Sequence, residues 1–97
     1  MAAELDGLPG AELVRVGVAA RARGERTVAA LVVSLAPTRL TAVGVEVPVV
    51  DGWPEEVELA LFEALRADPS VDDAYARYNA LRRELDSFLA AAEHRVA

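Results

Sequence analysis

The back half of the chain, residues 54–96, reads PEEVELALFEALRADPSVDDAYARYNALRRELDSFLAAAEHRV. Its apolar residues recur at intervals of three and four, which is the spacing of a buried stripe on an α-helix. The Asp68-Pro69 pair divides the stretch, because proline pushes the preceding residue out of the α region. The pattern predicts two helices, at 54–67 and 70–95, packed antiparallel across this turn. The core expected of them is Val57, Leu61, Leu65, Tyr75, Tyr78, Leu85 and Leu89.

Both expected helices carry start signals. Pro54 stands where a first-turn proline belongs, and the glutamates after it complement the positive end of the helix dipole. Ser70 is expected to cap the second helix, with Asp73 as an acidic variant of the capping box. At about 1.5 Å per residue, a helix of about 25 residues spans roughly 37 Å, which is longer than a domain this small needs across its core.

The front half allows two interpretations, and the first is β-structure. Valines alternate at residues 14–18 and again at 43–49, and Gly24 would then lie in a hairpin turn. Valine alternation is weak evidence in this chain, since the neighbouring alanines are apolar too. This interpretation gives an α+β fold, a three-stranded antiparallel sheet followed by two helices.

The second interpretation is helical and uses start and stop signals along the chain. Pro9 and Gly24 would bound a first helix with the stripe Leu13, Val16, Gly17 and Ala20. Thr27 would cap a second helix, and Pro37 would begin a third that ends at Gly44 in a Schellman motif. We favour this interpretation, which predicts an all-α fold: a small bundle of four to five helices with a long C-terminal helix.

The length and the turn residues indicate how the chain is organised. The 97 residues are enough for one domain, which we expect over 1–97. An acidic segment at 1–8 is expected to be a loose leader. Residues 46–54, with two prolines and a glycine, are expected to be an internal linker.

Composition excludes several classes of function. The net charge of −6 argues against nucleic-acid binding. The chain has no cysteine and a single histidine, His94, and no phosphate-binding or hydrolase motif occurs. We therefore expect no catalytic residues, no metal and no cofactor. The longest apolar run, at 28–36, has nine residues where a membrane span needs about 20. With no signal-peptide pattern at the start, the expected location is the cytoplasm.

One helix face gathers the most unusual side chains. Tyr75, Tyr78, Asn79 and Arg82 follow the spacing i, i+3, i+4, i+7. Asparagine is unfavourable inside a helix, and arginine beside an apolar stripe needs an acceptor. The face is either an internal polar network or a site for a small polar ligand or a partner.

Three further features have two explanations each. Arg39 either pairs with an acid from residues 46–73 or, with Arg82, holds a carboxylate or phosphate. Trp53 either packs on the core as a lid or anchors a partner. The arginines at 21–26 form either a solvated turn or a patch for an acidic partner.

The length of the last helix predicts self-association. Its stripe continues beyond the reach of the shorter helix before it, and the interface expected there is Phe88, Leu89, Ala92 and Val96. Residues 13–45 hold five arginines against one glutamate, net +4, and residues 46–75 hold nine acids against one arginine, net −8. These regions could pair between two copies.

We therefore expect a non-catalytic assembly module, a homodimer with a possible further protein partner. Two alternatives remain open. The front-half helices could cover the stripe and leave a monomer. A small-molecule site for an anion, or an enzyme, could be built around Arg39, Tyr78, Asn79 and Arg82.

Overall fold

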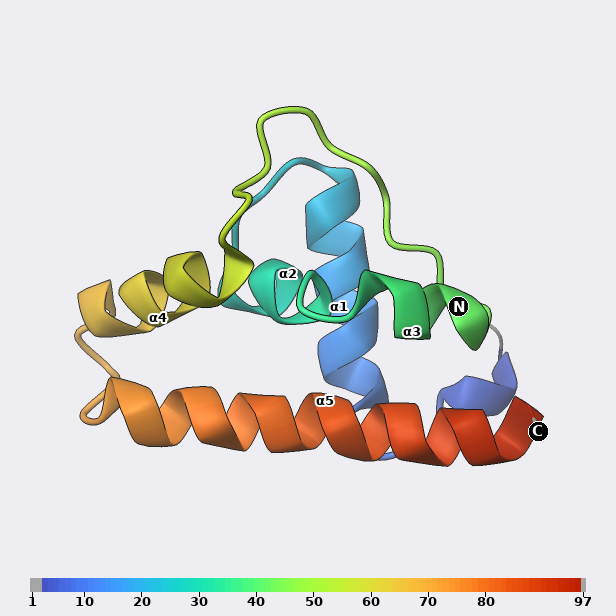
Figure 1. Cartoon of the computed structure of the whole chain (residues 1–97). Helices are drawn as coiled ribbons and strands as arrows, with labels where there is room; N and C mark the ends of the chain where they lie inside the picture. Colours follow the sequence, from blue (N-terminus) through green and yellow to red (C-terminus); the bar gives the residue numbers. More distant parts are fainter. Residues whose placement is uncertain (1–2, 97) are drawn as a thin grey trace.

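The computed structural model describes residues 3–96, and these residues form helices and no strand (Figure 1). A 3₁₀ turn at Ala3–Leu5 precedes five α-helices: α1 (Ala11–Ala22), α2 (Val28–Val33), α3 (Pro37–Ala42), α4 (Val57–Ala67) and α5 (Ala74–Val96). The predicted all-α fold with a long C-terminal helix is confirmed. The α+β alternative is wrong, because local signals rather than valine alternation determine the front half.

Capping residues bound the front-half helices. Thr27 begins α2, since its Oγ1 accepts a hydrogen bond from the Ala30 N–H at 3.1 Å. α3 begins with Pro37 in its first turn, as expected. It ends at Gly44, which has a φ of +88°. There the Val45 N–H donates to the Leu40 carbonyl at 2.9 Å, which is the bond of a Schellman motif.

The short helix α2 lies at the centre of the molecule. Its residues Ala30 to Val33 are all buried, and it packs against α1, α4 and α5. The contact with α1 requires Gly17, because a Cβ there would lie 2.3 Å from the carbonyl oxygen of Ala29. Of the stripe predicted for α1, Gly17 and Ala20 are buried, whereas Val16 is exposed and Val14 is buried in its place.

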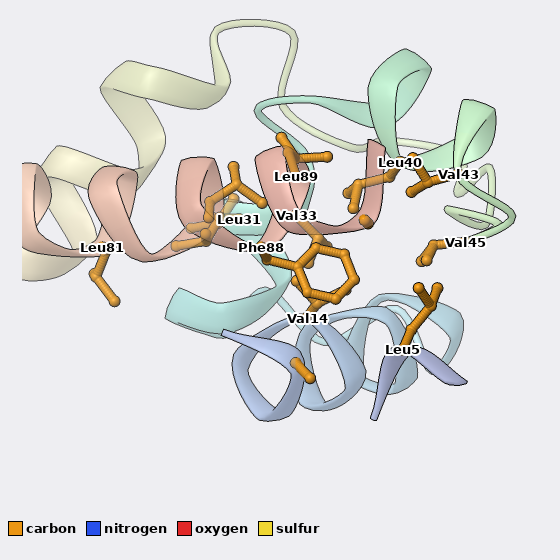
Figure 2. Close-up of a cluster of buried hydrophobic side chains, with 14 of the residues drawn as sticks. Leu5, Val14, Leu31, Val33, Leu40, Val43, Val45, Leu81, Phe88 and Leu89 are labelled. Atoms are coloured by element: carbon orange, nitrogen blue, oxygen red, sulfur yellow. The ribbon is translucent and has the colours of Figure 1, made fainter. Parts of the chain in front are cut away.

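The core joins α5 to the front half. α5 contributes five buried side chains: Leu81, Leu85, Phe88, Leu89 and Ala92. Figure 2 shows the Phe88 ring among Val14, Val33 and Leu40, which come from α1, α2 and α3. Leu5 joins the same cluster, so the segment expected to be a loose leader contributes a core residue.

This packing corrects the expected interface. Phe88, Leu89 and Ala92 each have 0% of their surface exposed within a single chain. The front-half helices cover the stripe, which is the alternative that the sequence left open, and these three side chains offer nothing to a second copy. The side chain of Val96 lies outside the described part of the chain.

The back-half helices begin later than predicted. α4 starts at Val57 rather than Pro54. α5 starts at Ala74, and its cap is Asp73, whose Oδ1 accepts from the Ala76 N–H at 3.0 Å. Ser70 instead donates through its N–H and Oγ to Asp68, so it belongs to the turn and not to the helix.

A strap, residues 45–56, connects α3 to α4 and contains no helix. It arches over the top of the molecule in Figure 1. It includes the region expected to be a linker, and it carries Trp53.

Candidate functional site

The outer face of the α4–α5 pair exposes apolar and aromatic side chains. We define it by Leu59, Phe62 and Tyr75, and by Tyr78, which is partly buried and also packs against the core. Leu59 is 50% exposed and Tyr75 is 67% exposed. Phe62 and Tyr75 line one shallow hollow between the end of α4 and the start of α5. Leu59 lies one turn before Phe62 on the same side of α4. Tyr75, which was expected in the core, therefore belongs to the surface.

Arg82 connects the two helices beside this face. Its Nη1 donates to the hydroxyl oxygen of Tyr78 at 3.2 Å and to Oε1 of Glu58 at 3.3 Å. The hydrogen bond with Tyr78 is the main cause that raises the pKa of Arg82 above its usual value. Asn79 is partly buried on the same stretch of α5. Among the four residues that spacing placed on one face of this helix, Tyr78 and Arg82 thus form an internal polar network, which was one of the two explanations.

Arg39 lies elsewhere. Its guanidinium forms two hydrogen bonds to Glu93, Nε to Oε2 at 2.9 Å and Nη2 to Oε1 at 2.7 Å. This bidentate pair raises the pKa of Arg39 and lowers the pKa of Glu93, in each case mainly through the hydrogen bond. The acid expected for Arg39 was one from residues 46–73, and that expectation is wrong.

The predicted anion site around Arg39 and Arg82 is not assembled. Their partners on the back half are Glu93 and Glu58, and Glu93 lies eleven residues beyond Arg82 on α5. At about 1.5 Å per residue, that is about 16 Å along the helix. The two guanidiniums therefore cannot hold one small anion between them.

Trp53 packs on the molecule as a lid. Its indole Nε1–H donates to Ser34 Oγ at 3.0 Å, and its ring lies under the Arg21 guanidinium, with 4.9 Å between the guanidinium carbon and the ring centroid. Ser34 in turn donates to the Ala30 carbonyl at 2.7 Å. Of the two roles considered for Trp53, these contacts describe the lid.

Arg21 is the residue that sequence reasoning missed. It donates through Nε to the Pro48 carbonyl at 2.6 Å and through Nη1 to Ser34 Oγ at 2.5 Å. Burial lowers the pKa of Arg21 below its usual value. The sequence placed it in a solvated turn. Two of the partners of Arg21 are Trp53 and Ser34, and both stand out in the sequence. Neither lies near position 21 along the chain, so the sequence did not indicate that Arg21 contacts them.

Its neighbours are also engaged within the chain. Arg26 donates through Nη2 to the Gly52 carbonyl, a second bond to the strap. Arg23 pairs with Glu25 at 2.8 Å on the surface. Among the arginines of this turn, Arg21 and Arg26 thus hold the strap, and Arg23 forms a local ion pair.

Comparisons with known proteins yield no relative. The chain matches no protein-family model, no curated protein and no solved structure. Within residues 3–96, no helix is both long and apolar enough to cross a membrane. In the same range, carboxylate and imidazole side chains form no cluster of three that could hold a metal ion.

Proposed function

We propose that this protein is a non-catalytic assembly module, which associates with a second copy of itself through the outer face of α4 and α5. The observation that carries the proposal is the exposure of Tyr75 beside Phe62, with which it lines one hollow, together with the exposure of Leu59 one turn earlier on α4. Tyrosine is enriched among the residues that contribute most to binding, because its ring buries a large area with little loss of conformational freedom. The cytoplasmic location stays a prediction.

The charges around the outer face support a second copy as the occupant. Glu58 and Glu63 lie beside Arg66 and Arg82 on the same pair of helices. In a two-fold contact, the same patch of each copy faces its counterpart on the other copy. A patch that carries both signs of charge is therefore complementary to itself. Such charges add orientation and specificity more than affinity.

The location of the face supports the proposal too. In Figure 1, α4 and the first half of α5 lie to one side of α1, and α2 packs against both helices from within. The outward side of the pair is then left to solvent. Two helices from each copy would make a four-helix contact, in which the side-chain ridges of one pair pack into the grooves of the other.

The test is sedimentation velocity over a range from about 10 µM to about 1 mM. We expect the mass to rise above the 10.3 kDa of one chain as concentration increases. Tyr75→Asp should weaken the dimer at least about tenfold, because a carboxylate would be desolvated in the contact. A single-chain mass throughout this range would overturn the proposal.

The matched control is Val49→Asp. Val49 is 93% exposed and lies on the strap, which contains none of the residues that define the outer face. We expect this variant to associate like the wild-type chain. If Val49→Asp alone abolishes association, the contact is at the strap and the proposed face is wrong. Far-UV circular dichroism of each variant checks that the helices are intact.

A further inference from the structure

We infer that the strap is a lid that opens and closes as a unit while the five helices stay folded, with Arg21 and Arg26 as the hooks that hold it. The inference concerns the strap, which contains none of the residues that define the outer face. Val45 and Val47 pack against the core, so the part of the strap that opens is residues 48–56. The inference rests on how few bonds attach that part to the rest of the chain, and on the chemistry of those few.

Main-chain hydrogen bonds contribute little to holding the strap down. The Val45 N–H belongs to the end of α3. Among the described residues between Val45 and α4, one backbone–backbone hydrogen bond is formed. It runs from the Trp53 N–H to the Val50 carbonyl, at 3.4 Å. That bond closes a turn inside the strap and does not tie it to a helix. A segment with so few tertiary backbone bonds belongs to the low-stability end of a folded protein.

Side chains make the attachment instead. Arg21 reaches the Pro48 carbonyl and Arg26 reaches the Gly52 carbonyl. The indole of Trp53 completes the attachment through Ser34 Oγ and the stacked Arg21 guanidinium. All these contacts converge on the C-terminal ends of α1 and α2 and on the turn between these helices, so losing them would release the strap together and not residue by residue.

The hooks hold neutral acceptors, which makes the closed strap easy to open. The ion pairs among the described residues do not include Arg21, whose acceptors are a carbonyl, a hydroxyl and an aromatic ring. Closing the strap removes water from the guanidinium, and its lowered pKa reflects that cost. Opening returns water to the charge and leaves the Leu85–Leu89 part of the core untouched.

The opening has a structural consequence. A hollow lined by Ser34, Leu35 and residues 55–59 lies beside the Trp53 contact. When the indole leaves, Ser34 Oγ loses one of its donors and keeps its bonds with Arg21 and Ala30, and the hollow extends into the space that the ring occupied. The strap therefore acts as a lid over the C-terminal end of α2.

Hydrogen exchange on the intact wild-type chain tests this. Trp53 is the only tryptophan, so its indole N–H gives a single resonance. After correction for intrinsic rates, we expect this proton to exchange at least about 100-fold faster than the amide of Leu89. Its rate should change little in low urea, whereas the rate of Leu89 should rise with urea, since local opening exposes little surface.

Two outcomes would overturn the inference. One is an indole proton with the protection and urea dependence of Leu89, because the strap would then open only with global unfolding. The other is an indole that exchanges as in a free peptide, because no closed state would exist.

A pair of variants identifies the hook. Arg21→Gln should speed exchange of the indole at least about tenfold and change the rate of Leu89 less than about threefold. The matched control is Arg23→Gln, which removes the same charge from the same turn but loses only the pair with Glu25. Equal effects of the two variants on the indole would show that Arg21 does not hold the strap.

Discussion

The two halves of α5 have opposite environments on one continuous helix. In the second half, Phe88 and Leu89 are sealed by helices from the front of the chain. In the first half, Tyr75 is largely exposed and Tyr78 partly so. The sequence pattern suggested the reverse, with the tyrosines in the core and Phe88 at a contact between copies. The spacing of apolar residues identifies a face of a helix, and it does not identify what covers that face.

The largest expected effect comes from truncating one aromatic ring in each half. Phe88→Ala should lower the free energy of unfolding by about 3 to 5 kcal/mol, because it leaves a cavity where α1, α2, α3 and α5 meet. Tyr75→Ala, from a ring 67% exposed, should cost less than about 1 kcal/mol. Urea denaturation monitored by circular dichroism measures both. Similar losses for the two variants would contradict the contrast between the halves.

The next effect tests how the front half seals the core. Gly17→Ala places a methyl group against the backbone of α2, with the Ala29 carbonyl oxygen 2.3 Å from the new Cβ. Overpacking of this kind costs typically about 1 to 3 kcal/mol, which exceeds the gain in helix propensity of roughly 1 kcal/mol. Unfolding by urea should show the net loss.

Gly7→Ala is the control for Gly17→Ala. A Cβ at Gly7 would meet nothing within 4 Å, so this variant should be close to neutral. If Gly17→Ala leaves the free energy of unfolding unchanged as well, α1 and α2 can move apart without loss of stability. The packing that covers Phe88 would then be less tight than the contact between these helices implies.

What the sequence predicted well was local. The cap at Thr27 and the helix end at Gly44 depend on residues within one turn of each other, and both are confirmed. What it could not predict depends on distant partners. Arg39 finds Glu93 across 54 positions, and Arg21 finds Pro48 across 27. Any acid or carbonyl could have satisfied these arginines, and only the packing of the helices determines which one lies in reach.

The same distinction explains the candidate site. Spacing alone placed Tyr75, Tyr78 and Arg82 on neighbouring positions of one helix, and the Tyr78–Arg82 contact follows from that. The contribution of α4 to the outer face was missed. Leu59 and Phe62 lie off the predicted stripe of this helix, so the pattern left them outside the core, but nothing in it indicated that they lie on a face with the tyrosines of α5.

A smaller effect on stability distinguishes the two residues proposed to cap the N-terminal end of α5. Asp73→Ala removes the acceptor of the Ala76 N–H and should cost about 1 kcal/mol, within a usual range of about 0.5 to 2. Ser70→Ala removes only a hydroxyl that donates to Asp68 within the turn, and should cost less. Thermal unfolding of the two variants separates them. A larger loss for Ser70→Ala would restore the cap that the sequence suggested.

The smallest effect concerns the ion pair on the sealed half of α5. The hydrogen bond from Arg39 lowers the pKa of Glu93 below its ordinary value of 4.5. A carboxyl whose pKa is lower in the folded state stabilises that state at neutral pH. This contribution is lost as the pH falls through the folded pKa, on the acid side of 4.5. Both side chains are exposed, so water and salt screen the pair and its contribution is small.

Glu93→Gln checks the sign of that contribution. We measure urea midpoints of the variant and the wild-type chain from neutral pH down into the acid range. The wild-type chain should be slightly more stable near pH 7, and the difference should shrink as Glu93 takes up its proton. Glu63→Gln removes the same charge from a residue that takes part in none of the ion pairs within residues 3–96, and its difference from the wild-type chain reports general charge effects. If the two variants follow the same curve, the bond between α3 and α5 adds nothing to stability, and apolar packing alone closes the front half over Phe88.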